Sequence, residues 1–409
     1  MSREPSVPGA LRPTPGSPQA RQTRSEPLES GPERSGPALP APDLPGSALP
    51  GPDLPGSALP GPDRPAPDQL GPALPGPGQP GSLAAVRPLP RGPVPTRLRP
   101  SRLRAGSRVA VVAPSGRTDP GLVADGCRLL AGWGLDVQVA PHALAAHPDL
   151  GYLAGDDAGR AADLQRAWLD PRVEAVLCAR GGYGAQRIAD RLDWAAMAAV
   201  PPKIFAGFSD ITALHEAFAL RLGVPTLHAP NVGGDSFTTF PEAQQGLRRA
   251  LFEPDRPDAR VLAWDGADRL VPGRAAGRTA GGNLSLLAAG LATPDGRQAG
   301  PSGGGFAGCI LLLEDVREEC YRLDRMLTQL LRAGALDGVQ GIALGSWTDC
   351  GAPEAVRQVM QDRLGGLGVP VARGLPFGHT APQPTVPLGV PAELDAGQGT
   401  MTFAEHAVA

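Results

Sequence analysis

Short apolar runs and longer stretches of helical spacing alternate along the chain from residue 108 onward. The apolar runs predict strands, at 108–114, 136–140, 173–179, 203–208 and 224–230. The stretches between them carry apolar residues at helical spacing and predict helices, at 120–134, 158–170, 185–194 and 211–222. Continuous apolar strands that alternate with helices are typical of a mainly parallel sheet with helices on both faces.

The pattern changes after residue 272. A strongly apolar strand is predicted at 308–315, an amphipathic helix at 316–334, another strand at 339–347 and paired strands within 385–405. The stretch between the two patterns is polar and contains many turn-forming residues. We therefore predict an α/β domain at 105–235, a linker region at 236–272 and a β-rich α+β domain at 273–409.

The first 100 residues lack either pattern. They hold 27 of the 49 prolines and none of the 17 Phe, Trp and Tyr residues, and "LPGSALPGPD" occurs twice, at 44–53 and 54–63. Such a segment cannot bury enough apolar surface to offset its chain entropy, so we predict that residues 1–100 are disordered. The start, "MSREPSVPGA", has no apolar core, and a secretory signal is not expected.

Composition and charge narrow the class of protein. The formal net charge is −3, which argues against nucleic acid as a partner, and no run of 18 apolar residues predicts a membrane helix. The five cysteines are widely spaced, and Cys178 and Cys309 lie inside apolar strands. They indicate buried thiols in a reducing compartment, without zinc spacing. We expect a cytoplasmic protein that binds no metal or other cofactor.

Ser209 lies where the predicted strand 203–208 meets the following helix. A turn at the carboxyl end of a parallel strand places its side chain at the edge where ligands bind, and the helix N-terminus favours a developing negative charge. Serine is also a favoured N-cap residue, and Ile211 stands where the G-x-S-x-G pattern has its last glycine. The local sequence leaves open whether Ser209 is a nucleophile or a helix cap.

A nucleophilic serine needs a base, and the base needs an orienting carboxylate. Four histidines are set aside because of a loop position, a different helix face or a frayed chain end: His142, His147, His215 and His406. His228, in an apolar strand, and His379, in the loop "GLPFGHTAP", remain. Glu314 and Asp315 end a buried strand, and only one of them can face the site because successive side chains alternate.

Five sequence blocks resemble, in order, those of the LD-carboxypeptidases, a serine peptidase family that also contains the microcin C immunity peptidases. They are "RGGYGAQRIADRLDW" (180–194), "KIFAGFSDITALH" (203–215), "GRTAGGNLSLL" (277–287), "ILLLEDVREECYRLDRML" (310–327) and "GLPFGHT" (374–380). The resemblance spans about residues 105–405. It implies a parallel α/β N-terminal domain and a β-rich C-terminal domain, with the site between them.

The same resemblance implies the roles of individual residues. The serine of the G-x-S-D block is the nucleophile, the glutamate of the L-E-D block orients the base, and the histidine of the F-G-H block is that base. In this chain they are Ser209, Glu314 and His379. The backbone N–H groups of Asp210 and Gly182 would form the oxyanion hole.

A substrate with a free terminal carboxylate requires a cation or several N–H donors. Candidates are Arg180, Arg278 and Asn283, and Tyr183 could stack on the substrate. The glycine-rich insert at 295–308 and the N-terminal tail depart from the family, and the sequence does not reveal their roles. It also leaves open whether the protein forms a homodimer.

The implied function is that of a serine carboxypeptidase that hydrolyses an L,D-peptide bond. It would release terminal D-alanine from a murein tetrapeptide during peptidoglycan recycling, because "GGNLSLL" and "LLLEDV" look more like that branch of the family. Two alternatives remain. One is an immunity-type peptidase that cleaves aminoacyl-nucleotide conjugates. The other is a non-catalytic α/β binding protein in which Ser209 only caps a helix.

Overall fold

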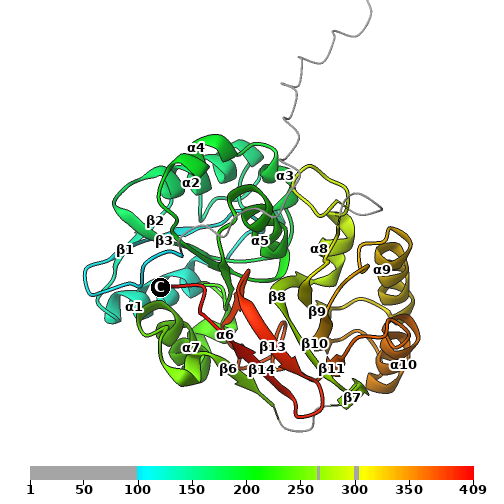
Figure 1. The fold of residues 1–409 in the computed structure, drawn as a ribbon. Helices are drawn as coiled ribbons and strands as arrows, with labels where there is room; N and C mark the ends of the chain where they lie inside the picture. The colour runs from blue at the N-terminus through cyan, green and yellow to red at the C-terminus, as the bar shows by residue number, and fades with distance from the viewer. Residues whose placement is uncertain (1–98, 265–267, 299–303) are drawn as a thin grey trace, which may run out of the picture. The chain divides into compact units, whose positions relative to one another are not determined.

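The computed structural model describes residues 99–264, 268–298 and 304–409 (Figure 1). The prediction of disorder for residues 1–100 therefore falls almost wholly outside the described residues, as does part of the 295–308 insert. The described chain contains two sheets, and the predicted combination of an α/β half with a β-rich half is confirmed.

The first sheet has the strand order β12-β5-β4-β3-β1-β2. Five of its strands are the predicted ones and pair in parallel: β1 (Arg108–Val112), β2 (Asp136–Val139), β3 (Val173–Cys178), β4 (Ile204–Gly207) and β5 (Thr226–His228). The sixth, β12 (Val386–Leu388), is antiparallel to β5 and pairs Val386 with His228. A segment that the sequence pattern assigns to the second domain thus extends the first sheet.

The helices around the first sheet are α1 (Pro120–Gly132), α2 (Asp157–Leu169), α3 (Gln186–Ala189), α4 (Trp194–Ala199) and α5 (Thr212–Ala217). Asp119, Asp156 and Asp193 cap α1, α2 and α4 by accepting first-turn N–H groups. The prediction of a single helix at 185–194 is wrong. The structure has two short helices there, α3 and α4, which are separated before the cap residue Asp193. The helix predicted at 211–222 is α5 followed by a π-helical turn at Phe218–Leu222.

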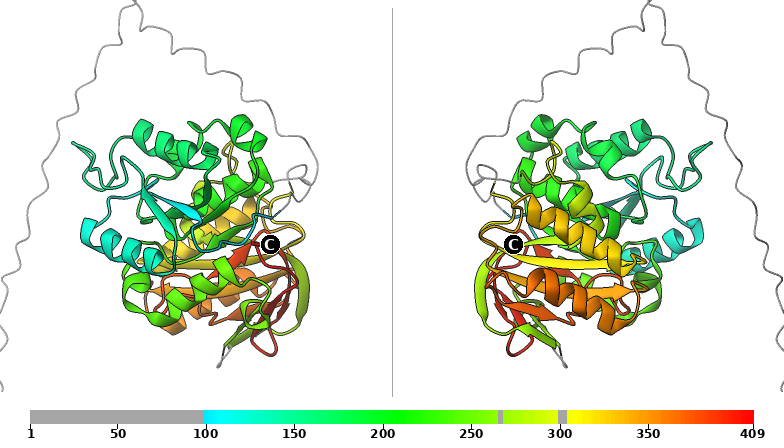
Figure 2. Two further views of the ribbon diagram at one scale, coloured as in Figure 1. Left: turned by 90° about the vertical axis from the view of Figure 1, so that its left-hand side faces the viewer. Right: turned by 90° about the vertical axis from the view of Figure 1, so that its right-hand side faces the viewer.

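The second sheet is mixed, with the order β6-β14-β13-β8-β9-β10-β11-β7. Its parallel centre is β8 (Arg274–Asn283), β9 (Cys309–Val316), β10 (Gly341–Thr348) and β11 (Val371–Arg373). The strands β13 (Pro391–Asp395) and β14 (Thr400–Phe403) form the predicted hairpin. The helices of this half are α8 (Leu284–Ala289), α9 (Cys320–Arg332) and α10 (Pro353–Leu364), and α9 and α10 lie side by side (Figures 1 and 2).

The stretch predicted as a linker region carries regular structure. It contains α6 (Asp235–Thr239), α7 (Pro241–Phe252), a short 3-10 turn (Pro257–Ala259) and the two edge strands β6 (Val261–Ala263) and β7 (Asp268–Val271). Both strands belong to the second sheet, at its opposite edges. The stretch thus packs as part of the fold.

Apolar side chains of both sheets meet in one core. Val109 and Ala206 of the first sheet belong to the same buried cluster as Ile310 and Leu312 of the second. The segment that leads into β1 meets the C-terminal residue beside this core, because the Arg102 N–H donates to the Ala409 carbonyl over 2.8 Å. This shared core holds one sheet against the other.

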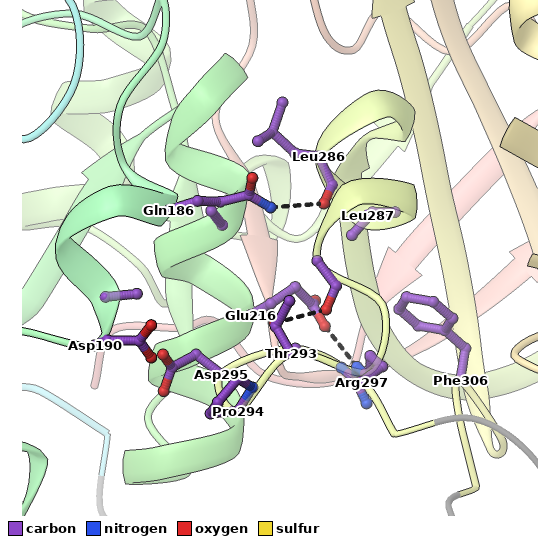
Figure 3. Close-up of a pocket in the computed structure, with 14 residues that line it drawn as sticks. Gln186, Asp190, Glu216, Leu286, Leu287, Thr293, Pro294, Asp295, Arg297 and Phe306 are labelled. Atoms are coloured by element: carbon purple, nitrogen blue, oxygen red, sulfur yellow. Dashed lines mark hydrogen bonds and ion pairs between the residues drawn. The ribbon is translucent and has the colours of Figure 1, made fainter. Parts of the chain in front are cut away.

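A second connection lies between α3 and α5 of the first half and the loop after α8 (Figure 3). There a cavity of about 160 Å³ is lined by apolar side chains, such as Leu287 and Phe306, and by polar and charged ones. Two ion pairs cross beside it: Arg297 Nε lies 2.5 Å from Glu216 Oε2, and Arg221 Nε lies 2.8 Å from Asp295 Oδ1.

Figure 3 shows the carboxyl groups of Asp190 and Asp295, which both line this cavity, close to each other. Burial and the neighbouring Asp190 raise the pKa of Asp295 to about 6, although Arg221 acts in the opposite direction. The folded chain therefore binds this proton more tightly than the unfolded chain does. Its contribution to stability is lost as the pH rises from about 4 to above 6.

We expect Asp190→Asn to stabilise the protein only where Asp295 is ionised. At pH 7.5 the variant should melt about 1 °C higher, a small effect because Asp190 is exposed and water screens its repulsion. At pH 4.5 the two melting temperatures should agree, because Asp295 is then protonated. Differential scanning calorimetry at both pH values measures the effect.

The matched control is Asp149→Asn, which removes an exposed carboxylate from a loop of the first half. It should change the melting temperature at neither pH. Equal stabilisation by both variants, or a rise for Asp190→Asn that is independent of pH, would contradict the role of the carboxyl pair.

Candidate active site

The chain bends sharply at Ser209, directly after β4. Gly207 ends the strand where a Cβ would lie 2.8 Å from Cys178 Cβ, so only glycine fits there. Phe208 is extended, and Ser209 then adopts φ = 68° before a 3-10 turn at Ser209–Ile211 leads into α5. A left-handed conformation costs a non-glycine residue about 1–2 kcal/mol and is typical of strained nucleophile turns.

The Ser209 hydroxyl contacts a histidine from the other half of the fold. Ser209 Oγ lies 3.0 Å from His379 Nε2, and His379 Nδ1 lies 2.7 Å from Glu314 Oε2. In the part of the chain that the structure describes, no side chain caps the 3-10 turn or α5. The hydroxyl is thus directed to His379, and the structure brings together the three residues that the family resemblance identified.

Glu314, and not Asp315, faces the histidine. Glu314 is fully buried on β9, where its Oε2 also accepts the backbone N–H of His379 over 3.1 Å. Gly378 has φ = 95°, and a Cβ there would lie 2.5 Å from the Glu314 carboxylate, so glycine permits this close approach.

Asp315 points away from the histidine and stabilises the start of α8. Its carboxylate accepts the Asn283 amide and the Ser285 backbone N–H, each over 2.9 Å, and burial raises the pKa of Asp315 to about 6. The alternation of side chains along β9 thus decides between the two acids that the residues alone left open.

The remaining histidines have other surroundings. His228 is completely buried with its ring centroid 4.3 Å from that of Phe377, and burial lowers its pKa well below the usual value. His215 Nε2 lies 2.9 Å from the Gly207 carbonyl oxygen. The expectation that His406 is frayed is wrong, because it is buried and its Nδ1 accepts the Val408 N–H.

The glycine turn at 180–184 lies against Ser209. A Cβ on Gly181 would come within 2.7 Å of Ser209 Cβ, and one on Gly182, at φ = 104°, would lie 3.2 Å from Gly116 Cα. Glycine is therefore required for the turn to approach the serine. The N–H groups of Gly182 and Asp210 lie in the segments that flank Ser209, and their oxyanion role stays a prediction.

Two of the four substrate-binding candidates lie in this turn. Arg180 is exposed, and its guanidinium donates to the Arg117 carbonyl oxygen. Tyr183 is 52% exposed and meets Tyr152 edge to face, with ring centroids 5.8 Å apart. Both side chains are exposed on the turn that lies against Ser209, and their role in substrate binding stays a prediction.

The other two candidates are placed differently. On β8, Asn283 pairs with Glu314, whereas Arg278 pairs with Cys309, about 16 Å back along the strand. The Arg278 guanidinium donates to the Gly389 carbonyl oxygen, so the structure does not bring it to the triad. Asn283 is 3% exposed, and its side chain caps α8.

The sequence interpretation missed the residues that fasten the histidine loop. Thr348 Oγ1 donates to the His379 carbonyl oxygen over 2.6 Å, and the Ser346 N–H donates to the Phe377 carbonyl oxygen over 2.9 Å. Both residues lie near the carboxyl end of β10, where the strand leaves the core. A polar side chain at the carboxyl end of a parallel strand is the signal that could have identified Thr348, whereas the Ser346 contact is made by the backbone.

The described ranges contain no group of three or more His, Cys, Asp or Glu residues that could hold a metal ion. Within the same ranges, no helix is both long and apolar enough to cross a membrane.

Two family models match this chain. The LD-carboxypeptidase N-terminal domain matches residues 109–229, and the LD-carboxypeptidase C-terminal domain matches residues 276–394. A Streptomyces coelicolor protein named as a carboxypeptidase is 58% identical over 306 residues, which cover 75% of this chain and 96% of that protein. The murein tetrapeptide carboxypeptidase of Pseudomonas aeruginosa is 34% identical over 304 residues, covering 71% and 94%.

Solved structures agree with these matches. Muramoyltetrapeptide carboxypeptidase from Oxalobacter formigenes superposes with a TM-score of 0.60 at 26% identity, covering 72% of this chain and 97% of that one. The microcin C7 self-immunity protein MccF gives a TM-score of 0.67 at 21% identity, covering 76% and 100%, a likeness of fold alone. Both domain models, the extent of the relatives and the shared fold lead to one conclusion: this chain belongs to the LD-carboxypeptidase family.

Proposed function

We propose that this protein is a serine carboxypeptidase that cleaves the L,D-peptide bond before a terminal D-alanine in a murein tetrapeptide. The observation that carries the proposal is the continuous contact from Ser209 through His379 to the buried Glu314. A hydroxyl, an imidazole and a carboxylate in this order are the groups that acyl-transfer chemistry requires.

His379 acts first as a base and then as an acid. Its Nε2 takes the proton from Ser209 Oγ as the oxygen attacks the carbonyl carbon of the scissile bond. The tetrahedral intermediate collapses when His379 gives that proton to the nitrogen of the leaving D-alanine. A water molecule, deprotonated by the same nitrogen of His379, then attacks the acyl carbon. His379 returns this proton to Ser209 Oγ as the bond to the serine breaks and the shortened peptide leaves.

Glu314 and the turn at 180–184 prepare the site for this cycle. The Glu314 carboxylate, 2.7 Å from His379 Nδ1, keeps a proton on that nitrogen and stabilises the imidazolium that forms. The N–H groups of Asp210 and Gly182 donate to the oxyanion. Of the two arginines among the substrate-binding candidates, we assign Arg180 to the terminal carboxylate of the substrate, because Arg278 is remote from the triad.

The names of the relatives support the murein substrate over the alternatives. The curated relative at 34% identity and the structure at 26% identity are both carboxypeptidases of murein tetrapeptides. The immunity-type alternative has the support of fold alone, and the direction of the Ser209 hydroxyl argues against a binding protein in which this serine only caps a helix. The cysteines are free, which supports a reducing, cytoplasmic location where recycled wall peptides are processed.

The substrate class is tested by offering the purified protein two compounds. We expect release of D-alanine from a murein tetrapeptide and no cleavage of an aminoacyl sulfamoyl adenylate, with products measured by mass spectrometry.

Ser209→Ala should fold normally and lose turnover by roughly a thousandfold or more, the scale of removing a triad member. Cleavage of the adenylate alone would favour the immunity-type function, and full activity of Ser209→Ala would refute the nucleophile.

The assignment of the carboxylate is tested on neighbouring acids. Glu314→Gln should lower kcat by roughly ten-thousandfold, because an amide beside Nδ1 favours the wrong histidine tautomer. Asp315→Asn is the matched control, since Asp315 is buried on the same strand but holds α8. It should lower the melting temperature and leave kcat within a fewfold. The reverse ranking of the two kcat values would contradict the role of Glu314.

A further inference from the structure

We propose that the side chains of Asp210 and Ser115 are positioning residues, which hold the glycine turn at 180–184 against the nucleophile. The inference rests on the proposed role of Ser209. It concerns the groups behind the oxyanion donors, which neither the family resemblance nor the triad geometry assigns.

One carboxylate oxygen joins three neighbouring loops. Asp210, 2% exposed, follows Ser209 at the end of β4, and its Oδ2 accepts both the Ser115 hydroxyl and the Ala185 N–H, the latter over 2.7 Å. Ser115 follows β1 and is completely buried, and Ala185 follows the glycine turn after β3. Because β4, β3 and β1 are adjacent, this oxygen connects the carboxyl ends of three neighbouring strands.

A buried arginine fastens the same loops from the side of α2. Arg160 is 1% exposed, and its Nη1 donates to the Pro114 carbonyl oxygen over 2.6 Å and to the Gly184 carbonyl oxygen over 2.9 Å. Its Nη2 pairs with Asp157. A Cβ on Gly184 would lie only 2.6 Å from the guanidinium, so glycine is required for this contact.

The other end of the turn is held by the backbone. The Gly116 N–H, directly after Ser115, donates to the Gly181 carbonyl oxygen over 2.9 Å. Ser115 thus lies between two attachments, its own hydroxyl on Asp210 and its neighbour's N–H on the turn. The segment that carries Gly182 is fixed before and after that residue.

This arrangement matters more to the transition state than to substrate binding. The oxyanion develops only as the bond to Ser209 forms, and donors stabilise it most when they are already aimed at its position. Asp210 presents its own N–H and holds the segment that presents the other. Loosening the segment should therefore lower kcat and leave KM nearly unchanged.

A merely structural role is separated from this one by a matched pair of serines. Ser115 and Ser107 are both fully buried at opposite ends of β1, and each hydroxyl makes one hydrogen bond, Ser107 Oγ accepting the Arg104 N–H over 3.0 Å. Only Ser115 lies at the active-site end. Each serine-to-alanine change removes one oxygen, so both variants should fold. The loss of thermal stability should be larger for Ser115→Ala, because its hydroxyl binds a carboxylate.

The test is the determination of kcat and KM for D-alanine release from a murein tetrapeptide. Ser115→Ala should lower kcat about tenfold with KM within twofold, and Ser107→Ala should leave both within twofold. Asp210→Asn keeps the size of the side chain and replaces the charged oxygen that accepts two hydrogen bonds by a neutral amide group. It should lower kcat about a hundredfold, the scale of losing one oxyanion donor.

Equal kcat values for Ser115→Ala and Ser107→Ala would overturn the inference, and so would a change confined to KM or to thermal stability. Should Asp210→Asn fail to fold, the pair of serine variants decides the question alone. Ser209→Ala, assayed in parallel, tests a different point. Its loss of activity together with equal serine variants would reject the positioning role only, whereas its full activity would reject the proposed function.

Discussion

The contact of Ser209 with the His379–Glu314 pair is the constraint on which the rest of this structure depends. Ser209 follows β4 of one sheet, Glu314 belongs to β9 of the other, and His379 lies in the loop between β11 and β12. The distance of 3.0 Å between Ser209 Oγ and His379 Nε2 therefore requires the sheets to keep their positions. The shared core does most of this, because apolar residues of both sheets form a single cluster. The ion pairs beside the cavity between α5 and the loop after α8 add a polar connection between the same halves.

Strain and close approach surround this contact. Ser209 adopts a left-handed backbone, and glycines at 181, 207 and 378 lie where any side chain would collide with a neighbour. Each of these features lowers stability in isolation, and they persist because the surrounding structure over-determines them. The buried Asp210 and Arg160 are part of that surrounding structure, since they bind the loops that converge on the serine. The positions that sacrifice local stability are those that shape the candidate active site.

The sequence predicted the alternating strands and helices well, because continuous apolar runs report strands that are buried on both faces. It predicted the meeting of Ser209, Glu314 and His379 only through the family resemblance, since neither acid nor histidine could be chosen from spacing. Register and side-chain direction explain the failures. Arg278 pairs with Cys309, at the opposite end of β9 from Glu314. The strand β12, which the sequence pattern assigned to the second domain, pairs with β5 of the first sheet. The pattern along a chain reports burial, and it does not report which distant segment a strand will pair with.

The most direct test of the two-sheet site is the reactivity of Ser209 itself. A fluorophosphonate probe followed by peptide mass spectrometry should label Ser209 in the parent protein, and labelling should be almost lost in His379→Ala, which removes the imidazole that the loop after β11 presents to the serine. His228→Phe, a change in a buried histidine that the proposed mechanism does not use, should leave Ser209 reactive. Labelling of Ser209 that is equally fast without His379, or labelling of another serine alone, would contradict a nucleophile activated across the two sheets.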